Sequence, residues 1–246
     1  MSNDRNKFVR SLDLGGLYLS LSGVVLGILF AVSDYHVAWD AALSLLGTTV
    51  LLHFYMATGG RIPLLLSVAG AVLTAWLSFD RILLMESLLL LLFGYFIIRL
   101  AKGTKGSSPV MRGVLDILLH GPIAVFGAYF VCTHTFGSWV LLFPSFSIGL
   151  LCAGAKGLRE YCGRNLCTAM ICAGLLFMTA FSFLRMYALS HFMYMLTVPL
   201  FILVMVPFFL YKGEDMYVFK LLFSVLAFCF ALIAGIGFMD IIFAAV

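Results

Sequence analysis

Carboxylate and imidazole side chains are the groups in this sequence that could do chemistry, and there are few of them. Carboxylate oxygens are the ligands that Mg²⁺ prefers in proteins, and Asp116 and Glu160 are the two acids that we expect to converge. Together they would hold one Mg²⁺ if water and phosphate oxygens completed its shell. His53 and His120 would act as a base or as metal ligands, because imidazole titrates near neutral pH. The alternative role of both histidines is a hydrogen bond across a helix interface.

Basic side chains gather in the same connections as these groups. A guanidinium or ammonium group pairs well with phosphate oxygens, so this set would bind a diphosphate or a phospholipid head group without a metal. The alternative is that the basic residues only set the orientation of the chain in a membrane, as they do in the short cytoplasmic loops of any membrane protein. The residues concerned are Arg61, Arg112, Lys156, Arg159 and Arg164.

The composition indicates that lipid is the solvent of this chain. Of its 246 residues, 63% are hydrophobic and only 11% are charged, which is too little polar surface to cover a water-soluble globule of this size. The net charge of +4 comes from short connections between apolar stretches, so we exclude nucleic acid as a partner. The six cysteines form no C-x-x-C motif and are interpreted as packing residues.

Nine apolar stretches are each long enough to cross a bilayer, and the positive charge lies on one side of them. With the N-terminus in the cytoplasm, 13 of the 15 Lys and Arg residues face inside and only Arg81 and Arg185 face outside. This distribution predicts a multi-pass protein of the cell inner membrane with its C-terminus outside. The predicted spans are 14–33, 38–58, 62–79, 82–100, 114–132, 137–155, 166–184, 190–211 and 217–239.

The connections between the spans are too short to hold a further domain. We therefore expect one all-α transmembrane domain over residues 1–246, with 1–13 as a cytoplasmic N-terminal segment. Only helices satisfy their own backbone in spans of this length, and the 23 glycines allow close contact between them. Prolines inside the spans, Pro122 among them, should kink their helices.

Three segments in the second half of the chain carry a family resemblance. They are HGPIAVFGAYFV at 120–131, FPSFSIGLL at 143–151 and GLRE at 157–160. Together they resemble the UbiA-type membrane prenyltransferases, above all the branch that prenylates dihydroxynaphthoate in menaquinone biosynthesis. The resemblance implies nine transmembrane helices, a cytoplasmic N-terminus and a central cavity that opens toward the cytoplasm. It also implies that Mg²⁺, held by two Asp-rich motifs, stabilises a diphosphate leaving group.

The chain departs from the family pattern at both motifs. The segment 53–63, at the position of the first motif, contains no acid. In the second, Glu160 matches the first Asp and Arg159 matches an Arg, but Arg164 stands where the second carboxylate belongs. Asp116 resembles an acidic position in the fifth helix of the family. A two-metal clamp would therefore lack ligands.

These observations leave the enzymatic status open among three hypotheses. In the first, the chain is a UbiA-like homologue, a possible pseudoenzyme, with lost or much reduced Mg²⁺-dependent prenyl transfer. It would retain a cavity for an isoprenoid or quinone-type lipid, and a protein partner is possible. In the second, it is an active transferase that joins a polyprenyl diphosphate to an acceptor such as 1,4-dihydroxy-2-naphthoate. A transporter or channel, the third, would require paired intramembrane charges, of which the spans offer almost none.

Overall fold

The chain folds into a bundle of helices. The computed structural model describes residues 13–34, 37–78, 108–135, 137, 139–160, 163–185, 197–211 and 216–238. All regular structure in these ranges is helical, which confirms the all-α class. The helices are α2 (Leu14–Asp34), α3 (Trp39–Thr58), α4 (Arg61–Ser78), α6 (Pro109–Leu118), α7 (Ala124–Thr133), α8 (Leu142–Glu160), α9 (Arg164–Arg185), α11 (Thr197–Leu210) and α12 (Tyr217–Phe238). A π-helical turn, η3 (Leu119–Ile123), joins α6 to α7, and a 3-10 turn, η4 (Trp139–Leu141), precedes α8.

Eight of the nine predicted spans correspond to helices. With α6, η3 and α7 counted as one continuous helix, the described residues contain eight helices, and the predicted span 82–100 lies outside them. The nine-helix bundle is therefore not confirmed. Helix α8 starts and ends five residues later than the predicted span 137–155, and it continues through Lys156 and Gly157 to Glu160.

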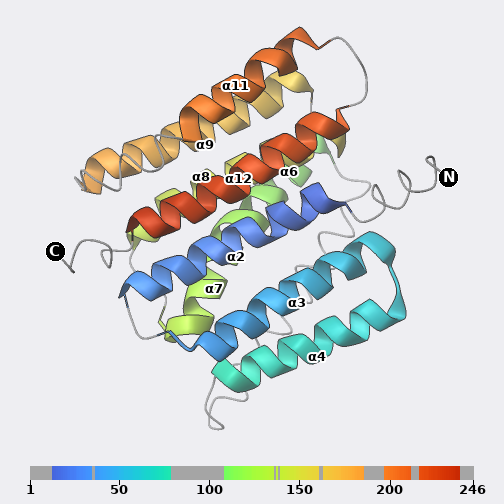
Figure 1. Ribbon diagram of the computed structural model, residues 1–246, viewed down its shortest axis with the longest axis vertical. Helices are drawn as coiled ribbons and strands as arrows, with labels where there is room; N and C mark the ends of the chain where they lie inside the picture. The colour runs from blue at the N-terminus through green and yellow to red at the C-terminus, as the bar shows by residue number, and fades with distance from the viewer. Residues whose placement is uncertain are drawn as a thin grey trace.

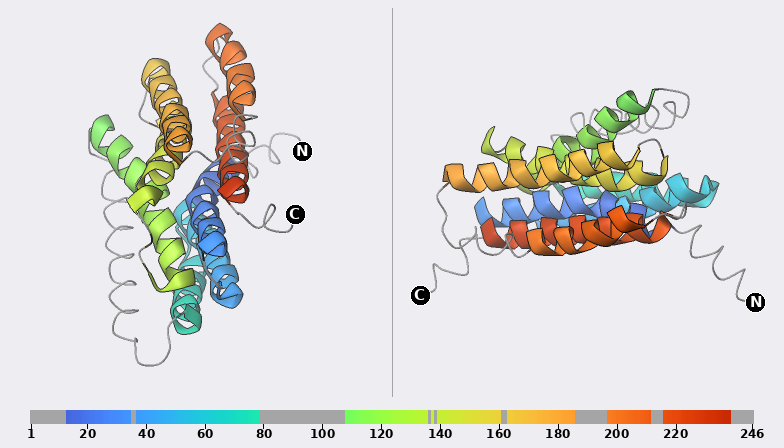
Figure 2. Two further views of the ribbon diagram at one scale, coloured as in Figure 1. Left: turned by 90° about the vertical axis from the view of Figure 1, so that its left-hand side faces the viewer. Right: turned by 90° about the horizontal axis from the view of Figure 1, so that it is seen from above.

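The helices lie roughly along one direction in the arrangement that Figure 1 shows. α3 and α4 pack together at one edge, α2 packs against α12 in the middle, and α8 packs against α9. The continuous helix from α6 to α7 lies behind α2 in this view and contacts both α2 and α8 (Figures 1 and 2). The three helices α2, α8 and α12 contact one another and form the centre of the bundle.

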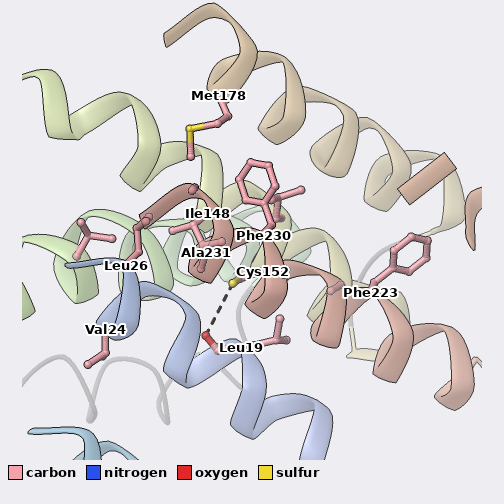
Figure 3. Packing of buried hydrophobic residues seen from close by; sticks show 14 of the residues in the cluster. Leu19, Val24, Leu26, Ile148, Cys152, Met178, Phe223, Phe230 and Ala231 are labelled. Carbon is pink, nitrogen blue, oxygen red and sulfur yellow. Dashed lines mark hydrogen bonds between the residues drawn. The ribbon is translucent and has the colours of Figure 1, made fainter. Parts of the chain in front are cut away.

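Apolar side chains from these three central helices fill the core. Leu19 and Leu26 of α2 face Ile148 of α8 and Phe230 of α12, and all four are nearly or fully buried (Figure 3). The thiol of Cys152 lies 3.8 Å from the carbonyl oxygen of Leu19. The core is therefore built from the first, the middle and the last parts of the described chain.

Helix α4 has its polar residues inside and its apolar residues outside. The Thr74 hydroxyl lies 2.9 Å from that of Ser44 and 3.2 Å from that of Thr48, both on α3, and Ser78 donates a 2.6 Å hydrogen bond to the carbonyl of Val131. A helix in water has the reverse arrangement, so this polarity indicates a lipid exterior. The exposed large side chains of α4 are Ile62, Leu65, Leu66, Val68, Val72, Leu73 and Trp76.

Five described helices are long and apolar enough to cross a membrane, and together with the polarity of α4 they indicate a membrane protein. Three further apolar helices are shorter: Leu142–Leu158, Arg164–Ala180 and Val198–Leu210. The five long ones are Leu14–Val32, Trp39–Thr58, Arg61–Ser78, Pro109–Thr133 and Tyr217–Ile236.

The helix that begins at Pro109 bends in its middle. Ser108 caps its first turn by accepting a hydrogen bond from the backbone N–H of Met111, and Pro109 occupies a position where no N–H is needed. At Gly121 the backbone leaves the helical region, with φ −101° and ψ −105°, directly before Pro122. The kink predicted at Pro122 is confirmed, and its π-helical turn has the form that often accompanies functional sites in helices.

Candidate functional site

One end of the bundle carries most of the described charged residues. The N-terminal ends of α2, α4, α6, α9 and α12 lie at this end, together with the C-terminal ends of α3, α8 and α11 (Figure 1). We call it the basic end, because six of the described Lys and Arg residues belong to these helix ends, whereas Arg185 ends α9 at the opposite side. The six are Arg61, Arg112, Lys156, Arg159, Arg164 and Lys220.

The first polar cluster of the basic end is centred on Asp116. This side chain is only 9% exposed, and Lys156 of α8 donates a 2.6 Å hydrogen bond to its Oδ1. His120, one turn later on the same helix face, places Nε2 4.0 Å from the same oxygen. Arg112 lies one turn earlier on that face, nearer to the helix end. Asp116, His120 and Lys156 are hereafter the Asp116 cluster.

Close packing of backbone on glycine brings these residues together. A Cβ on Gly121 would collide with the Ser145 carbonyl oxygen of α8, and one on Gly149 would collide with the Ile117 carbonyl oxygen. The two helices therefore touch along their backbones at these glycines. Lys156 follows Gly149 by two helical turns, so it projects from the face of α8 that contacts this helix.

A second polar cluster lies between α2, α3 and α12. The ammonium group of Lys220 is 3.3 Å from Oδ1 of Asp13, and the side chain of Lys220 is only 3% exposed while that of Asp13 is 32% exposed. A Cβ on Gly16 would collide with the Asp13 carboxylate and would lie 2.9 Å from Cε1 of His53. Asp13 and His53 therefore meet at Gly16, and we call Asp13, His53 and Lys220 the Asp13 cluster.

Sequence reasoning missed this second cluster. Asp13 belonged to the predicted cytoplasmic N-terminal segment, and Lys220 was counted only as a residue that sets orientation. One feature of the sequence pointed to Lys220. It lies inside the predicted span 217–239, and an ionisable residue within a span is a functional candidate by default. A buried lysine in an apolar helix calls for a carboxylate partner, and Asp13 supplies it.

The two predicted histidines lie in different clusters. His120 contacts Asp116, and His53, which is 9% exposed, lies beside Asp13. Both histidines contact α2, since a Cβ on Gly16 would lie 2.9 Å from Cε1 of His53 and one on Gly23 would collide with the backbone carbonyl of His120. The structure thus places the predicted histidines against the same helix, in separate clusters.

The predicted phosphate-binding residues have different surroundings. Arg164 donates a hydrogen bond to the carbonyl oxygen of Tyr211 and lies over the ring of Phe208, 5.7 Å from its centre, so it ties α9 to α11. Lys156 is paired with Asp116. Arg61 is exposed at the start of α4, and Arg112 is half-buried. The predicted set is therefore not a uniform cationic rim.

The predicted pair of Asp116 and Glu160 stays a prediction. Arg159 and Glu160 form the end of α8, but their side chains lie outside the part of the chain that the structure describes. Glu160 follows Lys156 by one helical turn, so its backbone position is on the same face of α8 and nearer to the helix end.

The described residues do not fit the Mg²⁺ that the family resemblance implies. Mg²⁺ binds carboxylate oxygens at about 2.1 Å and keeps a full octahedral shell. Oδ1 of Asp116 already accepts the Lys156 ammonium at 2.6 Å, so a metal on this oxygen would have to displace that group. Within the described ranges, no group of three or more His, Cys, Asp or Glu side chains is placed to hold a metal ion.

Comparison of the chain with known protein families, with curated proteins and with solved structures finds no match in any of the three.

Proposed function

We propose that this chain is a UbiA-like protein of the cell inner membrane that binds an isoprenoid or quinone-type lipid at its basic end. In this proposal its Mg²⁺-dependent prenyl transfer is lost or much reduced. The observation that carries the proposal is the 2.6 Å ion pair between Asp116 and Lys156. It involves the carboxylate that matches an acidic position in the fifth helix of the family and a lysine directly before the segment that matches the second Asp-rich motif.

The ion pair argues against metal-dependent transfer on energetic grounds. A Mg²⁺ ion that displaced Lys156 from Oδ1 of Asp116 would leave this partly buried ammonium group without its carboxylate partner, which costs about 2 kcal/mol. In return the ion would gain a single carboxylate ligand from Asp116. This balance favours a chain that keeps the helical architecture and no longer assembles the two-metal clamp.

The same cluster supports lipid binding. Lys156 is 29% exposed and His120 is 16% exposed, so the cluster is reachable from one side. Apolar side chains are exposed on other faces of the same helix, among them Val110 and Val114. An amphiphile would place its polar head at the cluster and its isoprenoid tail along the apolar exterior of the bundle.

The position of the described basic residues supports the proposed orientation. All six Lys and Arg residues of the basic end belong on the cytoplasmic side under the positive-inside rule. The N-terminus then lies inside and the C-terminus outside, with the lipid head group near the cytoplasmic leaflet. A partner protein that docks at this end would meet the same charges.

A prenyl-transfer assay tests the proposal. The full-length chain is incubated in detergent with dihydroxynaphthoate, a polyprenyl diphosphate and Mg²⁺, beside a transferase of known activity. The proposal expects no product from this chain and a co-purifying lipid with an isoprenoid tail. Product that disappears in both Asp116→Asn and Glu160→Gln would instead establish the active transferase, and an empty, inactive protein would contradict the lipid-binding function.

A further inference from the structure

The two lysines that reach into the bundle at its basic end each have a carboxylate partner. Lys156 pairs with Asp116 at 2.6 Å, and Lys220 pairs with Asp13 at 3.3 Å. With each imidazole counted as uncharged, both clusters have a net charge of zero. A ligand that enters between these helices therefore meets many hydrogen-bonding groups and little surplus positive charge.

This charge balance disfavours a diphosphate head group. A diphosphate carries two or three negative charges and is bound in proteins by several cations or by metal ions. Arg164, which the sequence suggested for that role, is held against Tyr211 and Phe208. Arg112, one turn nearer to the helix end on the same face as Asp116, adds one positive charge, which is fewer than a diphosphate needs.

The depth of the Asp116 cluster also disfavours a charged head group. Asp116 and His120 follow the predicted start of their span, residue 114, by two and six residues, which at 1.5 Å per residue corresponds to about 3 Å and about 9 Å along the helix. The hydrocarbon core of a bilayer is about 30 Å thick, so the predicted span places the cluster inside the half of the core that lies next to the basic end. Bringing a diphosphate to that depth would require its desolvation without enough compensating charge.

The hydrogen-bonding groups of the cluster suit an uncharged polar ring. The Lys156 ammonium donates, the Asp116 carboxylate accepts, and the His120 imidazole does one or the other at each nitrogen. We infer that the Asp116 cluster binds the ring of a quinone or quinol, through its carbonyl or hydroxyl oxygens, in preference to a diphosphate. This inference rests on the proposed lipid-binding function and narrows it to one class of head group.

Two ligands with the same tail test the inference. The wild-type chain, purified in detergent, is titrated calorimetrically with a quinone that bears two isoprene units and, separately, with geranyl diphosphate. We expect the quinone to bind at least about tenfold more tightly, a difference of about 1.4 kcal/mol. Tighter binding of geranyl diphosphate would overturn the inference while leaving the lipid-binding function intact, and binding of neither ligand would contradict both.

Neutralising the Asp116 carboxylate should shift the binding preference from the quinone toward geranyl diphosphate. Asp116→Asn releases the positive charge of Lys156, so the affinity for geranyl diphosphate should rise and that for the quinone should fall. Asp40→Asn is the matched control, because Asp40 is an exposed acid in the first turn of α3, at the opposite end of the bundle. Equal effects of the two variants would contradict the inference. A monodisperse elution profile and an unchanged helical circular dichroism spectrum show that each variant is folded.

Discussion

Polar contacts between helices differ between the helical hairpin of α3 and α4 and the basic end of the bundle. In the hairpin, hydroxyl groups of Ser44, Thr48 and Thr74 join the two helices without any charge. At the basic end, the helices meet through two ion pairs that involve Asp116 and Asp13. Helix association in lipid therefore needs no buried charge in this protein, since hydroxyl groups suffice where only packing is required.

The difference indicates where function lies. A charged side chain within a membrane is expensive and is retained where it binds or moves something. The hairpin, whose two helices contact each other through hydroxyl groups, exposes apolar side chains over most of α4 and has the character of a lipid-facing support. The ion pairs, by contrast, concentrate at the end where sequence analysis placed the candidate binding residues. Four predictions test this comparison, and we describe them from the largest expected effect to the smaller ones.

Gly23→Ala should have the largest effect. A Cβ at Gly23 would collide with the His120 carbonyl oxygen and lie 2.7 Å from the Cβ of Ala124, so backbone would have to move. We expect a loss of about 3 kcal/mol of stability, at the upper end of the usual cost of overpacking. Gly127→Ala is the control, since nothing lies within 4 Å of its added Cβ and alanine is the better helix former. Denaturation in a detergent series measures both, and equal behaviour would show that α2 does not pack closely on the kinked helix.

Asp116→Ala should cost about 2 kcal/mol. Breaking a buried ion pair on one side typically costs 3–5 kcal/mol, and the 29% exposure of Lys156 lowers that figure here. The double variant Asp116→Ala with Lys156→Met should recover most of the loss, because no charge is then left alone. A double-mutant cycle on unfolding free energies measures the coupling. Additive losses in the cycle would rule out the pairing as a source of stability.

The Asp13 cluster should respond unequally to removal of its two partners. Asp13→Ala leaves Lys220 with a buried charge, and we expect a loss of about 1.5 kcal/mol. Lys220→Met leaves Asp13, which is 32% exposed and is hydrated more easily, so about 0.5 kcal/mol is expected. The same unfolding measurement compares the two, and a reversed order would mean that Asp13 is the more deeply buried partner in the membrane.

Thr74→Val should have a small effect, similar in size to that of Lys220→Met. The substitution keeps the shape of the side chain and removes its hydrogen bonds with Ser44 and Thr48, which are worth about 0.6 kcal/mol in membrane proteins. Thr49→Val is the control within the hairpin, since its hydroxyl bonds the Leu45 carbonyl of its own helix. A loss above about 2 kcal/mol for Thr74→Val would mean that the hydroxyl contacts of the hairpin stabilise the protein as much as the ion pairs of the basic end do, and would contradict the comparison.

Helix positions followed from the sequence because hydrophobic length is a local property. The spans 14–33, 38–58 and 217–239 agree with α2, α3 and α12 to within about two residues. The end of α8 was harder to place, because Lys156 looked like the start of a loop while its ammonium group is in fact held by Asp116. A charge whose partner lies 40 residues away in the sequence cannot be recognised as intrahelical from local pattern alone.

The candidate site was predictable residue by residue but not in its pairing. Asp116, Lys156 and His120 were each identified, yet the carboxylate was assigned to a metal and the ammonium to a phosphate. Their mutual contact depends on backbone packing at Gly121 and Gly149, which only the tertiary structure reveals. Asp13 and Lys220, 207 residues apart, depend in the same way on the packing of α2 against α12.

Native mass spectrometry of the purified chain tests the account most directly. It detects a lipid that remains bound to the protein, and variants of the Asp116 cluster show whether the lipid is bound there. The wild type and the Asp40→Asn control should each carry one lipid with an isoprenoid tail. Lys156→Met should lose that lipid, since it removes the donor of the cluster and keeps the length of the side chain. Retention of the same lipid by Lys156→Met, or its absence from the wild type, would contradict the account.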